Sequence, residues 1–249
     1  TVLDSSYYTV TVDSEDANKF SVIVDILKAI KDGKIVEGNK LYTYYTGVLN
    51  ADAKVYDEGK QQNTACLLYS NNPHGNTRVE TPYVTVYDWT FKMNVQKIDG
   101  ADEEKELSGA KFVLSKNGAV DLGTIDENGT PAKTENLIKL VYDSENKTYR
   151  VATASDTNTT YVMTAGNITI NGLDDEVDYY LYETKAPAGY NRLTEPVKFK
   201  IYATYNGTGD RYTVVSTKVG DRDAVSGLKV SVENNAGTIL PSTGGMGTT

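Results

Sequence analysis

The chain of 249 residues is long enough for two domains, and its 39% hydrophobic and 24% charged residues indicate a folded protein rather than a disordered one. Its net charge of −9 and its sequence pI of about 4.7 argue against nucleic-acid binding and against docking on an anionic lipid surface, because both need basic side chains. The one cysteine, Cys66, excludes an intrachain disulfide, and the one histidine, His74, has no second histidine with which to bind a metal. We therefore expect neither a metal site nor a cofactor.

Strand patterns follow one another along most of the chain. Tyrosine, valine and threonine alternate with polar residues, which is typical of strands with one buried face. Such runs lie at 7–12, 40–48, 64–70, 83–89, 91–98, 111–115, 147–153, 178–184, 197–205, 211–217 and 228–234. The segments 127–130, 166–176 and 205–210 contain Asn-Gly sequences and are predicted to be turns. This order of elements predicts an all-β protein made of tandem immunoglobulin-like β-sandwiches.

One segment, 24–33, breaks the strand pattern. Ile26, Leu27 and Ile30 have helical spacing, and Gly33 stands where a helix would end. A short helix is therefore predicted here.

The boundary between two domains is predicted near residues 88–91, where one strand pattern runs directly into the next. A connection this short would be stiff rather than flexible. The limits that follow are a first domain at 1–90, a second at 91–236 and a tail at 237–249.

The tail contains LPSTGG at 240–245 and resembles the LPxTG sorting motif, in which a sortase cuts the Thr–Gly bond and joins the threonine carbonyl to an amine. Leu240, Pro241, Thr243 and Gly244 match the motif. Pro241 sets a kink, and Gly244 lets the thiol of the enzyme approach the carbonyl of Thr243. A chance Pro/Gly-rich loop is disfavoured by the position at the end of an acidic, β-rich chain. The apolar span expected after this motif does not follow, and the chain does not open with Met, so we expect a fragment.

The segment YYLYETKAPAGY at 179–190 is similar to the E-box of pilins and CnaB-type (SpaA-like) domains, whose pattern is YxLxETxAPxGY. In that family a glutamate promotes a spontaneous isopeptide bond between a lysine of the first strand and an asparagine of the last strand. The resemblance implies that Glu183 is the acid and that Lys97, in FKMNVQKID, is the lysine. Asn234, in LKVSVENNAG, alternates onto the same face as Val230 and Val232, so we favour it over Asn235 as the acceptor.

The residue types suit this chemistry. An amine attacks an amide only when it is unprotonated, and burial in an apolar core lowers the pKa of a lysine. Burial likewise favours a neutral glutamic acid, which can hydrogen-bond the amide carbonyl and pass protons to the departing ammonia. Taken singly, Lys97, Glu183 and Asn234 each have an ordinary structural interpretation, and only their joint placement favours the bond.

The segment 47–73 resembles the C-terminal half of a CnaA-like domain, which precedes the last domain of backbone pilins. In that family an asparagine near this strand end accepts a second isopeptide bond. Asn71 shares a face with Leu67 and Tyr69, so it is favoured over Asn72 as that acceptor. The lysine and aspartate that would complete this site are not found in the chain, and the domain at 1–90 is expected to be incomplete.

The resemblance implies a backbone pilin of sortase-assembled Gram-positive pili, located at the cell surface and anchored to the cell wall. Its partners would be a sortase, neighbouring pilin subunits, peptidoglycan and host ligands. A non-polymerised LPxTG adhesin, anchored through the same Thr243, is the alternative. An enzyme that uses Lys97 and Glu183 on an external substrate is disfavoured, because both residues alternate with apolar core positions.

Overall fold

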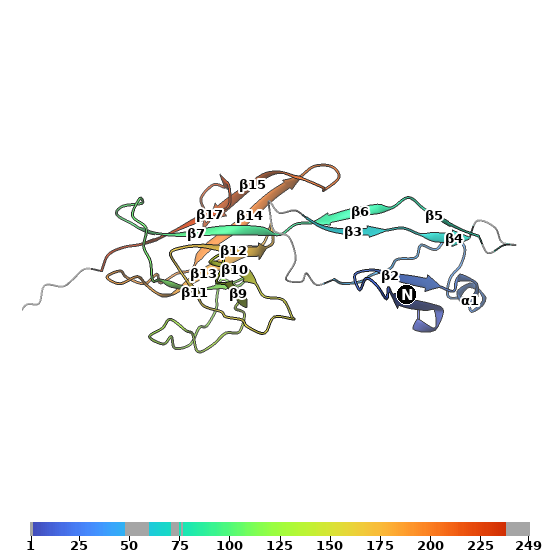
Figure 1. Cartoon of the computed structure of the whole chain (residues 1–249), viewed down its shortest axis with the longest axis horizontal. Helices are drawn as coiled ribbons and strands as arrows, with labels where there is room; N and C mark the ends of the chain where they lie inside the picture. Colours follow the sequence, from blue (N-terminus) through green and yellow to red (C-terminus); the bar gives the residue numbers. More distant parts are fainter. Residues whose placement is uncertain (1, 48–59, 71–74, 76, 238–249) are drawn as a thin grey trace, which may run out of the picture. The chain divides into compact units, whose positions relative to one another are not determined.

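The computed structural model describes residues 2–47, 60–70, 75 and 77–237, and nearly all regular structure within them is β-strand (Figure 1). The described helical segments are one short α-helix and one 3-10 turn. The all-β class predicted from the strand patterns is therefore confirmed. None of the described helices has the length and apolar character needed to cross a membrane.

The chain divides into two compact units, Thr1–Gly47 and Val48–Thr249. The domain limits expected from the sequence, 1–90, 91–236 and 237–249, differ from the limits of these units and stay a prediction.

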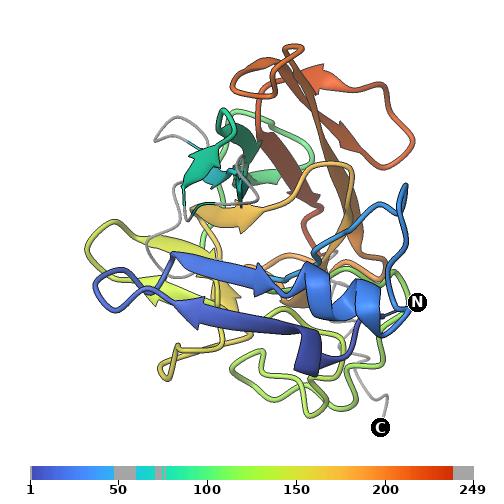
Figure 2. The ribbon, with the colours of Figure 1, turned by 90° about the vertical axis from the view of Figure 1, so that its right-hand side faces the viewer.

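The first unit is small. It contains the 3-10 turn η1 (Ser5–Tyr7), the antiparallel strands β1 (Tyr8–Val12) and β2 (Phe20–Val24), and the helix α1 (Ile26–Lys31). Figure 2 shows α1 directly after β2. A strand was also predicted at 40–48, but the described part of that run, 40–47, contains no strand. A strand needs a ladder of backbone hydrogen bonds as well as a suitable side-chain pattern, so alternation alone did not produce a strand here.

Helix α1 lies within the range predicted for it. The side chain of Asp25 accepts a hydrogen bond from the backbone N–H of Lys28 at 2.9 Å and so caps the N-terminus. Gly33 follows the end of the helix with a φ of 65°, a conformation that glycine adopts without steric cost. The apolar side chains whose spacing predicted the helix are exposed; they are Ile26, Leu27 and Ile30.

The second unit begins, in its described part, with two pairs of antiparallel strands. β3 (Gln61–Ala65) pairs with β6 (Val84–Asp88), and β4 (Leu68–Ser70) pairs with β5 (Arg78–Glu80). The run 64–70, which was predicted as one strand, is divided between β3 and β4. Cys66 lies at the division and is half-buried.

Two larger sheets form a sandwich in the rest of the unit. One sheet has the order β17-β7-β12-β10-β9, and the other has the order β11-β8-β13-β14-β15-β16. Their strands are β7 (Phe91–Asp99), β8 (Lys111–Ser115), β9 (Leu140–Asp143), β10 (Thr148–Val151), β11 (Met163–Thr164), β12 (Asn167–Leu173), β13 (Asp178–Lys185), β14 (Val197–Tyr205), β15 (Tyr212–Val219), β16 (Val225–Ser226) and β17 (Lys229–Asn234).

The first and last strands of the sandwich, β7 and β17, are parallel neighbours (Figure 1). Their register places Val230 opposite Val95, Val232 opposite Lys97 and Asn234 opposite Asp99. Residues more than a hundred positions apart in the sequence are therefore adjacent in one sheet.

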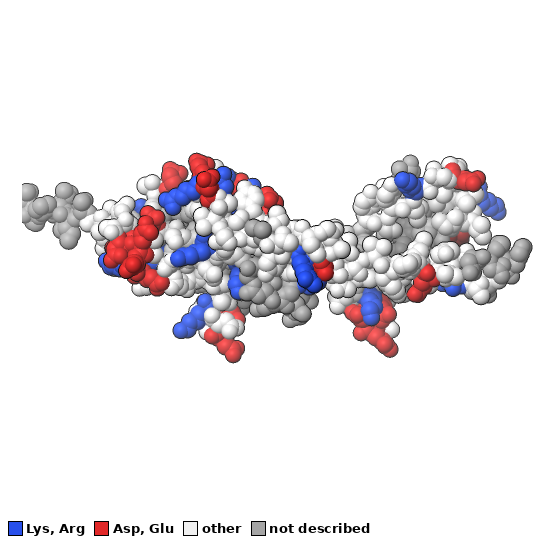
Figure 3. All heavy atoms as spheres, turned by 90° about the horizontal axis from the view of Figure 1, so that it is seen from above, with Lys and Arg blue, Asp and Glu red and all other residues white. Residues whose placement is uncertain are grey.

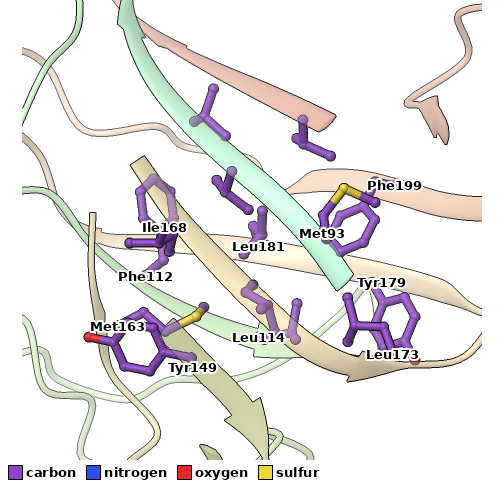
Figure 4. Packing of buried hydrophobic residues seen from close by; sticks show 14 of the residues in the cluster. Met93, Phe112, Leu114, Tyr149, Met163, Ile168, Leu173, Tyr179, Leu181 and Phe199 are labelled. Atoms are coloured by element: carbon purple, nitrogen blue, oxygen red, sulfur yellow. The ribbon is translucent and has the colours of Figure 1, made fainter. Parts of the chain in front are cut away.

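One hydrophobic core lies between the two sheets (Figure 4). Strands of both sheets alternate buried with more exposed positions, so each contributes a row of inward side chains. The large side chains that are fully buried in this core include Phe91, Met93, Phe112, Leu114, Leu140, Met163, Ile170, Leu173, Tyr179, Leu181 and Phe199.

The predicted turn at 166–176 is wrong, because most of it forms β12, a central strand of the five-stranded sheet. The Asn171-Gly172 pair that suggested a turn lies at a shift of register between β12 and β7. Gly172 has a φ of 83° there, so the glycine accommodates a β-bulge instead of reversing the chain.

We expect Gly172→Ala to lower the free energy of unfolding by about 1–2 kcal/mol, because an alanine must adopt the left-handed conformation at the bulge. Chemical denaturation followed by the fluorescence of the only tryptophan, Trp89, measures this change. Gly166→Ala is the matched control, since Gly166 does not have positive φ and an added Cβ would meet no atom within 4 Å. Equal effects of the two substitutions would contradict the role given to the bulge.

Candidate functional site

Lys97 occupies the end of an inward row on β7. Phe91, Met93 and Val95 precede it on the same face, and all are buried. The Lys97 side chain is itself fully buried, with an exposed fraction of 0%. A lysine therefore stands where the alternation of the strand calls for another core residue.

Glu183 and Asn234 end inward rows in the same way. On β13, Glu183 follows Leu181 and is 4% exposed. On β17, Asn234 follows Val232 and is 0% exposed, whereas Asn235 is exposed. The preference for Asn234 as the inward residue agrees with this burial.

A hydrogen bond between the two sheets joins these side chains. Nδ2 of Asn234 donates to Oε2 of Glu183 at 2.8 Å, and Nδ2 also donates to the backbone carbonyl of Asn191. The same Oε2 accepts a bond from the backbone N–H of Leu193 at 2.8 Å. Among the described residues, Oε1 of Glu183 and Oδ1 of Asn234 have no hydrogen-bond partner. The amide nitrogen thus contacts the carboxylate directly, within the core.

The amine of Lys97 is directed toward β17. Its Nζ donates to the backbone carbonyl of Val232 at 2.8 Å and to that of Ile98 at 3.3 Å. Burial lowers the pKa of Lys97 to about 8, although the carboxylates of Glu183, Glu233 and Asp99 oppose the shift. At neutral pH the neutral fraction of this amine is therefore larger than that of an exposed lysine.

The three predicted residues are thus brought to one end of the core. Lys97 contacts the carbonyl of Val232, two residues before Asn234 on the neighbouring strand, and Asn234 contacts Glu183. The arrangement combines an amine with a lowered pKa, a primary amide and a carboxylate that holds the amide nitrogen. These are the groups needed to transfer an acyl group from an amide to an amine.

Sequence reasoning missed the loop that completes this site. The backbone of Asn191 and Leu193 contacts both Asn234 and Glu183, and main-chain groups carry no sequence signal of their own. It also missed a polar cluster beside the site, in which the side chains of Asp99, Lys105 and Tyr190 are hydrogen-bonded to one another. Tyr190 belongs to the E-box segment and Asp99 follows Lys97 by two residues, but Lys105 stands in no recognisable motif.

Several predicted positions lie outside the described residues. They are Asn71, the proposed acceptor of a bond in the first domain, and Leu240, Pro241, Thr243 and Gly244 of the sorting motif. Within the described ranges, no group of three or more His, Cys, Asp or Glu side chains is arranged to hold a metal ion.

The charges on the face drawn in Figure 3 are mixed. The face drawn in Figure 3 carries basic and acidic side chains in small interspersed groups, without a continuous basic stripe. Such a face offers no array for neutralising successive phosphates.

A family model described as the SpaA prealbumin-like fold domain matches residues 91–218. The chain belongs to this family. The matched range begins with β7 and includes Lys97 and Glu183, whereas Asn234 lies beyond its end. The resemblance to backbone pilins with SpaA-like domains, expected from the E-box, is thereby confirmed.

Proteins similar to this SpaA-domain protein include fimbrial and pilin subunits. The fimbrial subunit type 1 of Actinomyces viscosus is 29% identical over 219 residues, which cover 80% of this chain and 38% of the relative. The chain thus spans well under half the length of this curated relative.

One solved pilin structure agrees with this chain in fold. A 35 kDa C-terminal fragment of the major pilin of Streptococcus agalactiae is 19% identical and has a TM-score of 0.53, over 94% of this chain and 79% of that one. A two-domain structure of the major pilin SpaD from Corynebacterium diphtheriae is 21% identical, with a TM-score of 0.42, over 95% of this chain and 77% of that one.

The buried amine of Lys97 predicts a pH dependence of stability. In an Asn234→Ala variant, which keeps the amine and removes the amide, the folded chain has a lysine with a pKa of about 8 against 10.5 for an ordinary lysine. Between these values the unfolded state binds more protons, so the free energy of unfolding should rise as the pH increases from about 8 to 10.5.

Urea unfolding across this pH range measures the effect. Adding Lys97→Met to the Asn234→Ala variant is the control and should abolish the rise. A profile that is the same in both variants would show that the Lys97 amine is not desolvated in the folded chain.

Proposed function

We propose that this chain is part of a structural subunit of a cell-surface pilus and that it cross-links itself through Lys97 and Asn234. Membership of the SpaA-domain family and similarity to a fimbrial subunit support the pilus assignment. The observation that carries the cross-link is the buried Lys97 amine beside a hydrogen-bonded Asn234–Glu183 pair.

The proposed reaction joins β7 and β17, the neighbouring strands that carry Lys97 and Asn234. The neutral amine of Lys97 attacks Cγ of Asn234, and a C–N bond forms while the bond from Cγ to Nδ2 breaks. The nitrogen of Asn234 leaves as ammonia, and an amide between the two side chains remains. No oxidant, metal or cofactor enters this balance. Holding the groups together replaces a bimolecular encounter, an advantage that reaches about 10⁵ M or more in effective molarity.

Glu183 has the role of proton carrier in this proposal. Its Oε2 already contacts the nitrogen that must leave, at 2.8 Å. A carboxyl group placed there takes the proton released by the attacking amine and delivers it to the departing nitrogen. The surrounding apolar side chains exclude water, which would otherwise compete for these protons.

The tail supports a second covalent step, catalysed by another protein. The LPSTGG sequence presents Thr243 for cleavage by a sortase, which would join this residue to a neighbouring subunit or to peptidoglycan. Localisation at the Gram-positive cell surface, anchoring to the wall and contact with host ligands follow from the same proposal. In this account the chain is a substrate and a structural part, not an enzyme.

The cross-link predicts a mass deficit. The purified wild-type chain should be lighter than its sequence by one ammonia, and Glu183→Ala should restore the full mass. Asn235→Ala is the matched control, because this neighbouring residue is exposed and should keep the deficit. Intact-mass spectrometry measures all three. A wild-type chain of full mass would refute the cross-link.

The cross-linked chain should also be more stable. The bond closes a loop of more than one hundred residues, and the chain-entropy model gives about 4–5 kcal/mol of stabilisation for such a loop. Chemical denaturation of the wild type and of Asn234→Ala measures the difference. A difference below about 1 kcal/mol would contradict the loop-closure account.

Polymerisation is tested in the cells that make the full-length protein. Immunoblots of wall extracts should show a ladder of high-mass products, and Thr243→Ala should abolish it. A single anchored band in the wild type would instead support the non-polymerised adhesin.

A further inference from the structure

A second polar cluster lies beside the proposed cross-link and takes no part in the reaction described above. The hydroxyl of Tyr190 donates to Oδ2 of Asp99 at 2.7 Å. Nζ of Lys105 donates to the same hydroxyl at 2.8 Å and to Oδ2 of Asp99 at 2.9 Å. Three side chains from separate segments thus meet in one closed set of hydrogen bonds.

Asp99 ties this cluster to the strand that carries the reacting lysine. It lies two residues after Lys97 on β7 and directly opposite Asn234 in the register with β17. The backbone N–H of Ala101 and the side chains of Lys105 and Tyr190 lower the pKa of Asp99 to about 2. Asp99 is therefore a permanent acceptor for Tyr190 at neutral pH.

Tyr190 is joined by one peptide bond to the residue that holds the reactive amide. The backbone carbonyl of Asn191 accepts a bond from Nδ2 of Asn234, and the backbone N–H of Asn191 donates to the carbonyl of Asn235 at 3.0 Å. Tyr190 itself forms a β-bridge with Ala236. The loop thus pairs with the chain at and just after the proposed acceptor.

The position of this loop determines how the amide is presented. Both hydrogens of Nδ2 are used, one by Glu183 and one by the carbonyl of Asn191. An amide bound at both hydrogens cannot rotate about its Cβ–Cγ bond without losing a hydrogen bond. The orientation of the amide is therefore held jointly by Glu183 and by the backbone of the loop.

We infer that Tyr190, anchored by Asp99 and Lys105, is a positioning residue for the cross-linking reaction: it fixes the loop whose backbone orients the Asn234 amide toward Lys97. This inference rests on the proposed self-cross-linking. Removing the hydroxyl should leave the three reacting groups in place but loosen the orientation of the amide, and small misplacements slow intramolecular reactions strongly.

The test follows the loss of ammonia in time. The full chain is isolated in denaturant before it has reacted, and its full mass is verified. It is then diluted into a series of buffers of different pH, and samples are quenched and weighed by mass spectrometry. The rate of ammonia loss plotted against pH has a midpoint, and the series is chosen to span the midpoint of the wild type. Trp89 fluorescence reports the folded fraction, to which each rate is normalised. We expect Tyr190→Phe to react about tenfold more slowly than the wild type at every pH, with an unchanged midpoint.

Tyr182→Phe is the matched control and should react at the wild-type rate. Its hydroxyl donates to the carbonyl of Asn117 and accepts from the backbone N–H of Val120, neither of which belongs to the site. An unaltered rate for Tyr190→Phe, or equal slowing in both variants, would overturn the inference. So would a midpoint that rises toward that of an ordinary lysine, because this would mean that water has entered around Lys97.

Lys105→Met provides a second test with little risk to folding, since the Lys105 side chain is 54% exposed. It removes one partner of the Tyr190 hydroxyl and should slow the reaction less than Tyr190→Phe does. In the Tyr190→Phe background it should have no further effect, and additive slowing would overturn the inference. A wild-type chain that never loses ammonia would instead refute the proposed cross-link itself.

Discussion

The buried amine of Lys97 is the constraint on which the rest of this site depends. A charged group in an apolar core is costly, and among the described residues the Lys97 amine donates hydrogen bonds to the backbone carbonyls of Val232 and Ile98. Loss of the proton relieves this cost and produces the nucleophilic form of the amine. In the proposed cross-linking, the same burial that destabilises an ordinary lysine prepares this one to react, and the adjacent Asn234–Glu183 pair would supply the acceptor and the proton carrier.

The sequence predicted the β-class and most strands, because alternation is a local signal that the inward rows of the sandwich obey. Alternation also separated buried Asn234 from exposed Asn235. Alternation failed as a guide where the pairing between strands decided the structure. The Asn171-Gly172 pair has the composition of a turn, but its neighbours bond to β7 and β10, and the glycine becomes a bulge. Residues 40–47 alternate equally well and form no strand.

The grouping of Lys97, Glu183 and Asn234 was available only through the resemblance of their segments to a family pattern. No spacing rule connects residues on β7, β13 and β17, since their adjacency arises from the parallel pairing of the first and last strands and from the packing of one sheet on the other. The contributions of Asn191 and Leu193 could not be predicted from the sequence, because their main-chain groups make these contacts irrespective of side-chain type. Lys105 shows the same limit for a side chain, since one of its two partners, Tyr190, lies 85 residues away in the sequence.

The parallel pairing of β7 and β17 has a consequence for how the domain would tolerate proteolysis under tension. With the proposed bond in place, a pull between Phe91 and the tail passes along β7 to Lys97, crosses to Asn234 and leaves the domain. The chain between these two residues, with the strands and long connections from β8 to β16, then forms a closed ring beside the load path. A single protease cut anywhere in that ring would open it without separating the two ends of the subunit. Under this proposal, a cut in one of the connections on the domain surface would leave the covalent path between β7 and β17 intact.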